Sequence, residues 1–183
     1  MPIDTPSSVV TKKAPEKDLV LISLNKDNKI FLSTGDSKAD KDSKQAIIES
    51  VNTNKNLGLT PTEIALLTKA PFIGVPLAQL KQQAKMSPDD MNATTLSGIL
   101  VKDSTDNEMV DWLRGVKDAY AGRQVNILLK GDNVAKYPGF KYILAALKKN
   151  DLLKFQMITN PSAIPAGSVL YVGIKNGTIK SAD

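Results

Sequence analysis

Apolar residues first cluster in two short segments near the amino end of the chain. Residues 18–24 (DLVLISL) and 30–33 (IFLS) are rich in β-branched and aliphatic side chains, and a polar segment separates them. This arrangement is typical of two strands joined by a turn. We therefore predict a β-hairpin with Asp27 and Asn28 at its turn, because both residue types tolerate a positive φ.

The spacing of apolar residues then changes to that of helices. Residues 46–51 (AIIESV) form one apolar helical face, and Ser43 is the expected cap. Residues 57–104 are divided by Gly and Pro into short segments that are too apolar for a solvated loop. We predict a helical insertion packed on the main core, with one helix starting at the capping box Thr60–Glu63 and a second over 76–84.

The last third of the chain has the most regular pattern. Thr105 and Glu108 have the spacing of a capping box, and apolar residues at spacings of three and four predict a helix from there to Tyr120, ended by Gly122. A parallel βαβ unit is expected next, with its strand, helix and strand at 124–130, 138–149 and 152–159. A final strand is expected at 168–174. The predicted fold class is α+β: two layers, with one mixed β-sheet (opening hairpin plus a βαβ unit), helices packed on one face and a helical insertion.

Composition removes several classes of chemistry. The 183 residues include no Cys and no His, so disulfides, thiolate or imidazole metal sites, histidine-based nucleophile pairs and histidine pH switches are all excluded. The hydrophobic fraction of 42% and the charged fraction of 23% are those of an ordinary folded domain. Phosphate-binding glycine motifs are also missing. We expect no catalytic residues, no metal and no cofactor.

The positive charge does not indicate a nucleic-acid partner. A net charge of +5 is spread along the chain, and only Arg114 and Arg123 are arginines, whereas nucleic-acid binders concentrate basic residues on one stripe. No apolar stretch is long enough to cross a bilayer. Residues 1–17 contain three prolines and no sustained period, which predicts a flexible arm ahead of a single domain at 18–183.

One loop has the position expected of a binding site. Residues 131–137 (GDNVAKY) follow a predicted strand and precede a helix, and open α/β sheets place ligands at such strand ends. Asp132 and Tyr137 are its conspicuous members. Structural roles remain open for both, since Asp132 can order the turn and Tyr137 can pack against the helix start. An enzyme that uses Asp132, Tyr137 and Lys130 on a small ligand also remains an alternative.

Two separated blocks resemble the extracytoplasmic domain of the ExbD/TolR family. Residues 125–159 match its pattern of apolar strand, basic residue, small residue, Asp, four residues, Tyr, amphipathic helix and apolar strand, and residues 14–36 are similar to its opening hairpin. The matching positions are Lys130, Gly131, Asp132, Tyr137 and Lys154. The segments PFIGVPLAQLKQQ and DNEMVDWLRGVKDAY resemble those of a longer ExbD-like group that is typical of Bacteroidetes.

The resemblance implies a partner set and a location. Members of the family are single-pass proteins whose folded domain lies on the periplasmic side of the bacterial inner membrane; this chain resembles that domain without its transmembrane helix. They assemble with an ExbB-like motor subunit, form homodimers by exchanging arm strands, and contact TonB to support outer-membrane transport. The implied contact residues here are Asp132, Tyr137 and the arm residues Ile3, Asp4, Thr5, Pro6, Ser7 and Ser8. A TolR-like peptidoglycan-binding tether is the alternative within the family.

Overall fold

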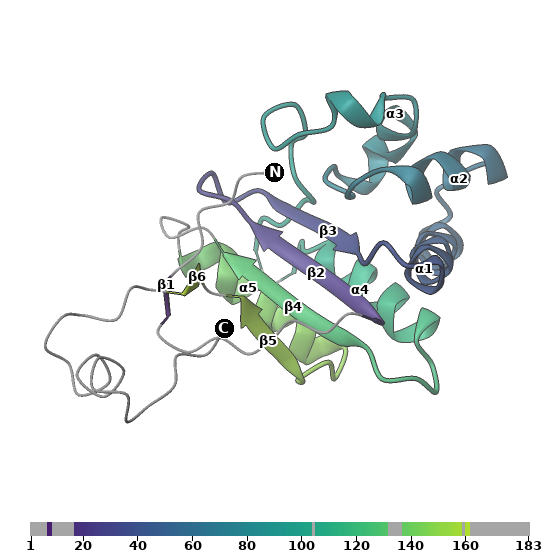
Figure 1. The fold of residues 1–183 in the computed structure, drawn as a ribbon. Helices are drawn as coiled ribbons and strands as arrows, with labels where there is room; N and C mark the ends of the chain where they lie inside the picture. Colours follow the sequence, from purple (N-terminus) through teal and green to yellow (C-terminus); the bar gives the residue numbers. More distant parts are fainter. Residues whose placement is uncertain (1–6, 9–16, 104, 132–136, 159, 162–183) are drawn as a thin grey trace, which may run out of the picture.

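One mixed four-stranded sheet organises the fold. The computed structural model describes residues 7–8, 17–103, 105–131, 137–158 and 160–161. The sheet has the order β3-β2-β4-β5; β2 is antiparallel to β3 and parallel to β4, and β4 is parallel to β5 (Figure 1). The strands are β2 (Leu19–Leu24), β3 (Ile30–Thr34), β4 (Asn126–Gly131) and β5 (Phe155–Ile158). The predicted α+β class, with an opening hairpin and a parallel βαβ unit, is confirmed.

The hairpin turn between β2 and β3 is held by one asparagine. Asn25 Oδ1 accepts hydrogen bonds from the backbone N–H groups of Asp27 at 3.0 Å and Lys29 at 2.9 Å. Asn28 has a φ of 59°, in the left-handed region that Asn tolerates. The predicted turn is therefore correct, although only Asn28 of the expected pair has a positive φ.

Three helices cover one face of the sheet. They are α1 (Lys38–Lys55), α4 (Met109–Ala119) and α5 (Tyr137–Lys149), and α4 packs against both of the others (Figure 1). Alternate strand residues point towards them and are almost fully buried, among them Val20, Ile22, Leu24, Ile127 and Leu129. Trp112, fully buried on α4, is the largest side chain of this core.

Helix α1 begins earlier than the sequence pattern suggested. Its cap is Ser37 rather than Ser43: Ser37 Oγ accepts from the Asp40 N–H at 3.1 Å and donates to Asp40 Oδ2 at 2.6 Å. Ser43 instead lies inside the helix, buried, and accepts from Arg123 Nη2 at 3.1 Å. The first two turns of α1 are mostly polar, so the apolar period that located residues 46–51 could not reveal them.

Replacing Ser37 with alanine tests this cap. Because the substitution leaves an orphan helix N–H, we expect Ser37→Ala to lower the free energy of unfolding by about 1 kcal/mol. Ser87 is a matched control, since it stands at the cap position of the 3-10 turn η2 (Pro88–Asp90) without a side-chain hydrogen bond. Urea unfolding should separate the two variants, and an equal loss in both would rule out a specific capping role for Ser37.

The insertion forms short helices at the β3 side of the sheet. Helix α2 (Pro61–Lys69) starts with the predicted capping box, in which Thr60 and Glu63 exchange hydrogen bonds. The 3-10 turn η1 (Leu77–Gln79) and helix α3 (Leu80–Ala84) occupy the segment predicted as the second helix. Figure 1 shows α2 and α3 beyond β3, away from α5 and β5.

The second predicted capping box does not form. Helix α4 starts at Met109, and its cap residue Glu108 makes no side-chain cap bond. Thr105 donates to Asp103 at 2.6 Å, and Glu108 Oε2 accepts from the Leu77 N–H at 3.0 Å, tying α4 to the insertion. Thr105 and Glu108 therefore bond to groups outside the helix, although their spacing is that of a capping box. The helix also ends at Ala119, before Gly122, whose φ is +77°.

Two remaining expectations concern strands and membranes. Strand β5 is shorter than the predicted 152–159, and the strand predicted at 168–174 lies outside the described residues. Among the helices that the structure describes, none has both the length and the apolar character needed to cross a bilayer.

Candidate functional site

The insertion covers the outer edge of β3. The backbone groups of Leu32 and Ile73 exchange hydrogen bonds of 2.9 and 2.7 Å, and the Ile99 N–H donates to the Ile30 carbonyl at 2.9 Å. These bridges use edge groups that would otherwise be available to another strand. The β3 edge is thus occupied by the chain itself.

A buried glutamine holds this covering segment in place. Gln83, on α3, is fully buried; its Nε2 donates to the Phe72 carbonyl at 2.7 Å, and its Oε1 accepts from the Gly74 N–H at 3.2 Å. Gly74 approaches the Phe31 ring so closely that a Cβ at this position would lie 2.3 Å from a ring carbon. The two contacts fix residues 72–74 against β3 from both sides.

The opposite edge of the sheet has no such cover. Strand β5 is last in the strand order, and no strand in the described ranges pairs with its outer side. Leu153 is 64% exposed and Met157 is 50% exposed, whereas the third exposed large hydrophobic residue of the described part, Leu66, lies on α2. Exposed apolar side chains beside an open strand edge are typical of a contact surface. We call Leu153, Met157 and the outer side of β5 the β5 edge.

Part of the predicted arm pairs close to the β5 edge. Strand β1 (Ser7–Ser8) is parallel to β6 (Asn160–Pro161), with Ser7 opposite Asn160 and Ser8 opposite Pro161. Since β5 ends at Ile158, β6 begins only two residues beyond it. Figure 1 shows the β1–β6 pair beyond the end of β5. Strand pairing by the arm therefore occurs next to the uncovered side of the sheet.

The region around the β5 edge is positively charged. Residues 137–158 contain four lysines and one acidic residue, Asp151, whose carboxylate lies 3.6 Å from Lys117 Nζ. The lysines are Lys141, Lys148, Lys149 and Lys154. An acidic partner would be attracted to this surface, with a salt-dependent rate of association.

Some of the site residues predicted from the sequence lie in the part of the chain that the structure describes, and others do not. Ile3, Asp4, Thr5, Pro6 and Asp132 lie outside the described residues. Ser7 and Ser8 form β1, and Tyr137 is the first residue of α5. Lys130, which the enzyme alternative placed with Asp132 and Tyr137, lines a hollow on the sheet face opposite the helices. Among the expected contact residues that the structure describes, Ser7 and Ser8 pair with another segment.

The sequence reasoning missed Leu153 and Met157. Both lie within the stretch predicted as a strand, 152–159, and hydrophobic side chains in a strand ordinarily indicate a core. Because β5 is the last strand, the core does not cover them. An indication was available in Lys149, shortly before the segment, and Lys154, within it, since such charges commonly protect an exposed strand edge.

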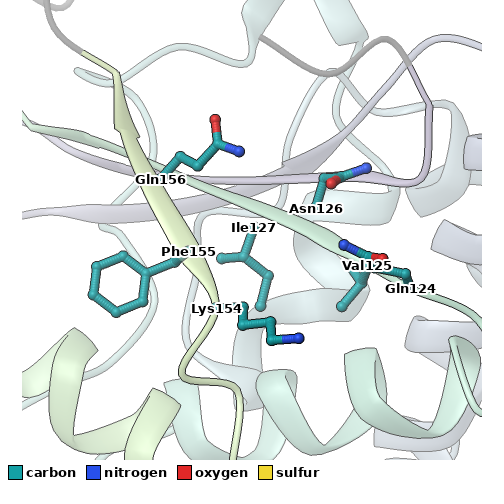
Figure 2. A pocket seen from close by; sticks show the side chains of 7 residues that line it. All are labelled: Gln124, Val125, Asn126, Ile127, Lys154, Phe155 and Gln156. Atoms are coloured by element: carbon teal, nitrogen blue, oxygen red, sulfur yellow. The ribbon is translucent and has the colours of Figure 1, made fainter. Parts of the chain in front are cut away.

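A second feature lies where β4 and β5 begin. A hollow of about 340 Å³ is lined by Gln124, Val125, Asn126, Ile127, Lys154, Phe155 and Gln156. Figure 2 shows Asn126 and Gln156 projecting to one side of the strands and Val125 and Lys154 to the other. Asn126 Nδ2 donates to the Lys17 carbonyl at 2.9 Å. Lys154, on the other side of the strands from these amides, is the one cationic side chain of the lining and suits an anionic group such as a carboxylate.

Acidic groups in the described ranges have structural partners. Asp40 is buried and accepts from the Leu19 N–H at 3.1 Å. Burial raises the pKa of Glu108, while hydrogen bonds from Thr105 and Asp106 lower the pKa of the exposed Asp103 to about 2. Within the described part of the chain, no three acidic residues gather closely enough to hold a metal ion.

Comparisons with known proteins identify no relative of this chain. No protein-family model, no curated protein and no solved structure matches this chain. The candidate sites therefore rest on this chain's own residues.

Proposed function

We propose that this chain is the periplasmic domain of an ExbD-like component of a proton-motive-force-driven energy-transduction complex, a coupling domain rather than an enzyme. It dimerises, and it contacts a TonB-like protein to support outer-membrane transport. An ExbB-like subunit is its partner in the membrane, reached through a transmembrane helix that precedes the domain. The proposal starts from the two sequence blocks that resemble the ExbD/TolR family.

One structural observation supports it most directly: the two edges of the sheet differ. The insertion covers β3 through Leu32 and Ile73, whereas the β5 edge is uncovered and exposes Leu153 and Met157. Strand addition to an uncovered edge supplies main-chain hydrogen bonds for affinity and side-chain contacts for selectivity. Among the described strands of this sheet, β5 is then the one edge at which a partner segment can pair.

Substitutions at the β5 edge test the partner contact. We expect Met157→Glu to weaken binding of the periplasmic part of a TonB-like protein at least ten-fold, because the substitution buries a charge in the interface. Isothermal titration with the whole chain measures the affinity, and urea unfolding checks that stability is retained. Leu66→Glu is the matched control, since Leu66 is similarly exposed but lies on α2. Equal loss in both variants, or none in Met157→Glu, would contradict the proposal.

Dimerisation by arm exchange has a separate test. The chain contains no cysteine, so Ser7→Cys and Asn160→Cys variants, mixed as separate chains, form a disulfide between positions 7 and 160 only when one copy's arm pairs with the other copy; each variant incubated alone controls for links between like positions. A cross-linked dimer on a non-reducing gel is the expected result. Ser7→Cys mixed with Lys102→Cys is the control. Linkage only within a doubly substituted chain would show that the arm stays on its own copy.

The hollow of Figure 2 favours a second candidate function, a TolR-like tether that binds peptidoglycan. Lys154, the one cationic side chain of its lining, suits a ligand with carboxylates, which peptidoglycan stem peptides carry. Sedimentation with purified sacculi separates the two candidates. The tether should pellet with sacculi and lose this property in Lys154→Gln, whereas the TonB-contacting domain should stay in the supernatant.

A further inference from the structure

The sheet face opposite the helices carries a hollow that neither candidate function uses. It measures about 260 Å³ and is lined by Leu21, Ser23, Phe31, Ser33, Pro71, Phe72 and Lys130. Three strands form its floor, and the insertion supplies its wall through Pro71 and Phe72. The Phe31 and Phe72 rings meet edge to face, with centroids 5.2 Å apart, so the apolar end of the hollow is rigid.

The cationic group of the hollow, Lys130, lies at its other end on β4, and Ser23 is its neighbour on β2. Ser23 lies opposite Lys130 on β4 and opposite Phe31 on β3, and Ser33 is opposite Leu21. Neighbouring strands are separated by about 4.8 Å, so the hollow runs roughly 10 Å from the ammonium group to the aromatic wall. Within the described part of the chain, no hydrogen bond or ion pair engages the side chains of Ser23, Ser33 or Lys130.

This distribution of groups selects one type of ligand. The backbone of β2 is already paired with β3 on one side and β4 on the other, so the floor offers side chains and no free main-chain groups. A peptide lying here would leave its own N–H and C=O groups unpaired, which is costly. A molecule with one anionic head and an apolar body has no such groups.

We propose that this hollow binds a free amphiphilic carboxylate with a chain of about eight carbons. Lys130 and the Ser23 hydroxyl hold the carboxylate, and Leu21, Phe31 and Phe72 contact the chain. One ammonium group and one hydroxyl group match a singly charged carboxylate. The length follows from the roughly 10 Å between Lys130 and the aromatic wall. The inference is independent of the proposed coupling function.

Ligand titrations followed by amide NMR test the site. Octanoate, kept below its micelle concentration, should give saturable shifts at Ser23, Phe31 and Phe72. Butyrate, which cannot reach the aromatic wall, and octan-1-ol, which lacks the charge, should each bind at least ten-fold more weakly. Equal responses to octanoate and octan-1-ol would overturn the proposal, as would shifts that map elsewhere or fail to saturate.

Charge variants give an independent readout. Lys130→Gln should weaken octanoate binding about ten-fold or more, because it removes the charge-assisted bond. Lys148→Gln removes one positive charge from an exposed position on α5 and should leave the affinity for octanoate unchanged. An equal loss in both variants would mean that octanoate responds only to net charge, and would sink the proposal. If Lys130→Gln folds poorly, the comparison of octanoate, butyrate and octan-1-ol on the unmodified chain still tests the proposal.

Discussion

Replacing Gln83 with leucine is expected to lower the free energy of unfolding by about 3 kcal/mol. Gln83 is fully buried and satisfies the Phe72 carbonyl and the Gly74 N–H. Leucine has a similar volume but bonds neither group, and each buried unsatisfied backbone group costs about 1–3 kcal/mol. Urea unfolding measures the loss.

Gln82 is the matched control for this substitution. It is the neighbouring residue on α3, is exposed, and should tolerate leucine within about 0.5 kcal/mol. Hydrogen exchange adds a local readout: in Gln83→Leu, the amides of Leu32 and Ile73 should lose protection before those of β4. If the β3 bridges keep their protection, Gln83 does not hold the insertion on the sheet edge.

Loss of the contacts that Gln83 makes would also change which edges of the sheet can pair with another chain. An uncovered β3 would give the sheet a second free edge, and free edges pair with other chains. Gln83→Leu should therefore also form assemblies larger than the proposed dimer at concentrations at which the unmodified chain does not. The insertion, whose purpose the sequence pattern left open, then has a physical role: it leaves β5 as the edge at which strands can add.

The strands and most helices could be predicted because local patterns determine them. The hairpin at Asn28 and the capping box of Thr60 and Glu63 depend on residues only a few positions apart, and both form as expected. The predicted capping box of Thr105 and Glu108 fails because Glu108 binds Leu77, 31 positions away. Sequence spacing carries no information about such a distant competitor.

The candidate site was predictable only in part, for a related reason. The arm residues Ser7 and Ser8 were expected to exchange with another copy; they pair with β6 of their own chain, so the exchange itself stays a prediction. The exposure of Leu153 and Met157 depends on β5 being last in the sheet, and the covering of β3 depends on bridges between distant segments. Both features depend on the order of the strands in the sheet, and local sequence patterns do not reveal that order.

Lys44 should make the stability of the chain rise with pH above neutrality. Its side chain is buried, and its Nζ donates to the carbonyl of Ala70, the residue that ends α2 just before the segment covering β3. Burial lowers the pKa of Lys44 from 10.5 to about 8, partly opposed by Asp36 and assisted by Lys41. Between these two values the unfolded chain binds more protons than the folded one, so stability increases with pH.

The size of this effect follows from the shift in pKa. Each pKa unit corresponds to about 1.4 kcal/mol, so the full penalty of the buried charge is about 3 kcal/mol below pH 8 and disappears above pH 10.5. We expect the free energy of unfolding to rise by about 2 kcal/mol between pH 7 and 9.5. The scan stops there because burial raises the pKa of Tyr120, and stability linked to that hydroxyl falls above pH 10.

Two methionine variants separate Lys44 from the general charge of the chain. Lys44→Met removes the buried amine and should flatten the profile between pH 7 and 9.5. Lys41→Met removes an exposed amine on the same helix and should keep most of the slope. Urea unfolding at each pH gives both profiles. If the free energy of unfolding of Lys44→Met still rises between pH 7 and 9.5, other groups cause the pH dependence. The contact between Lys44 and Ala70 would then hold the insertion without contributing to that dependence.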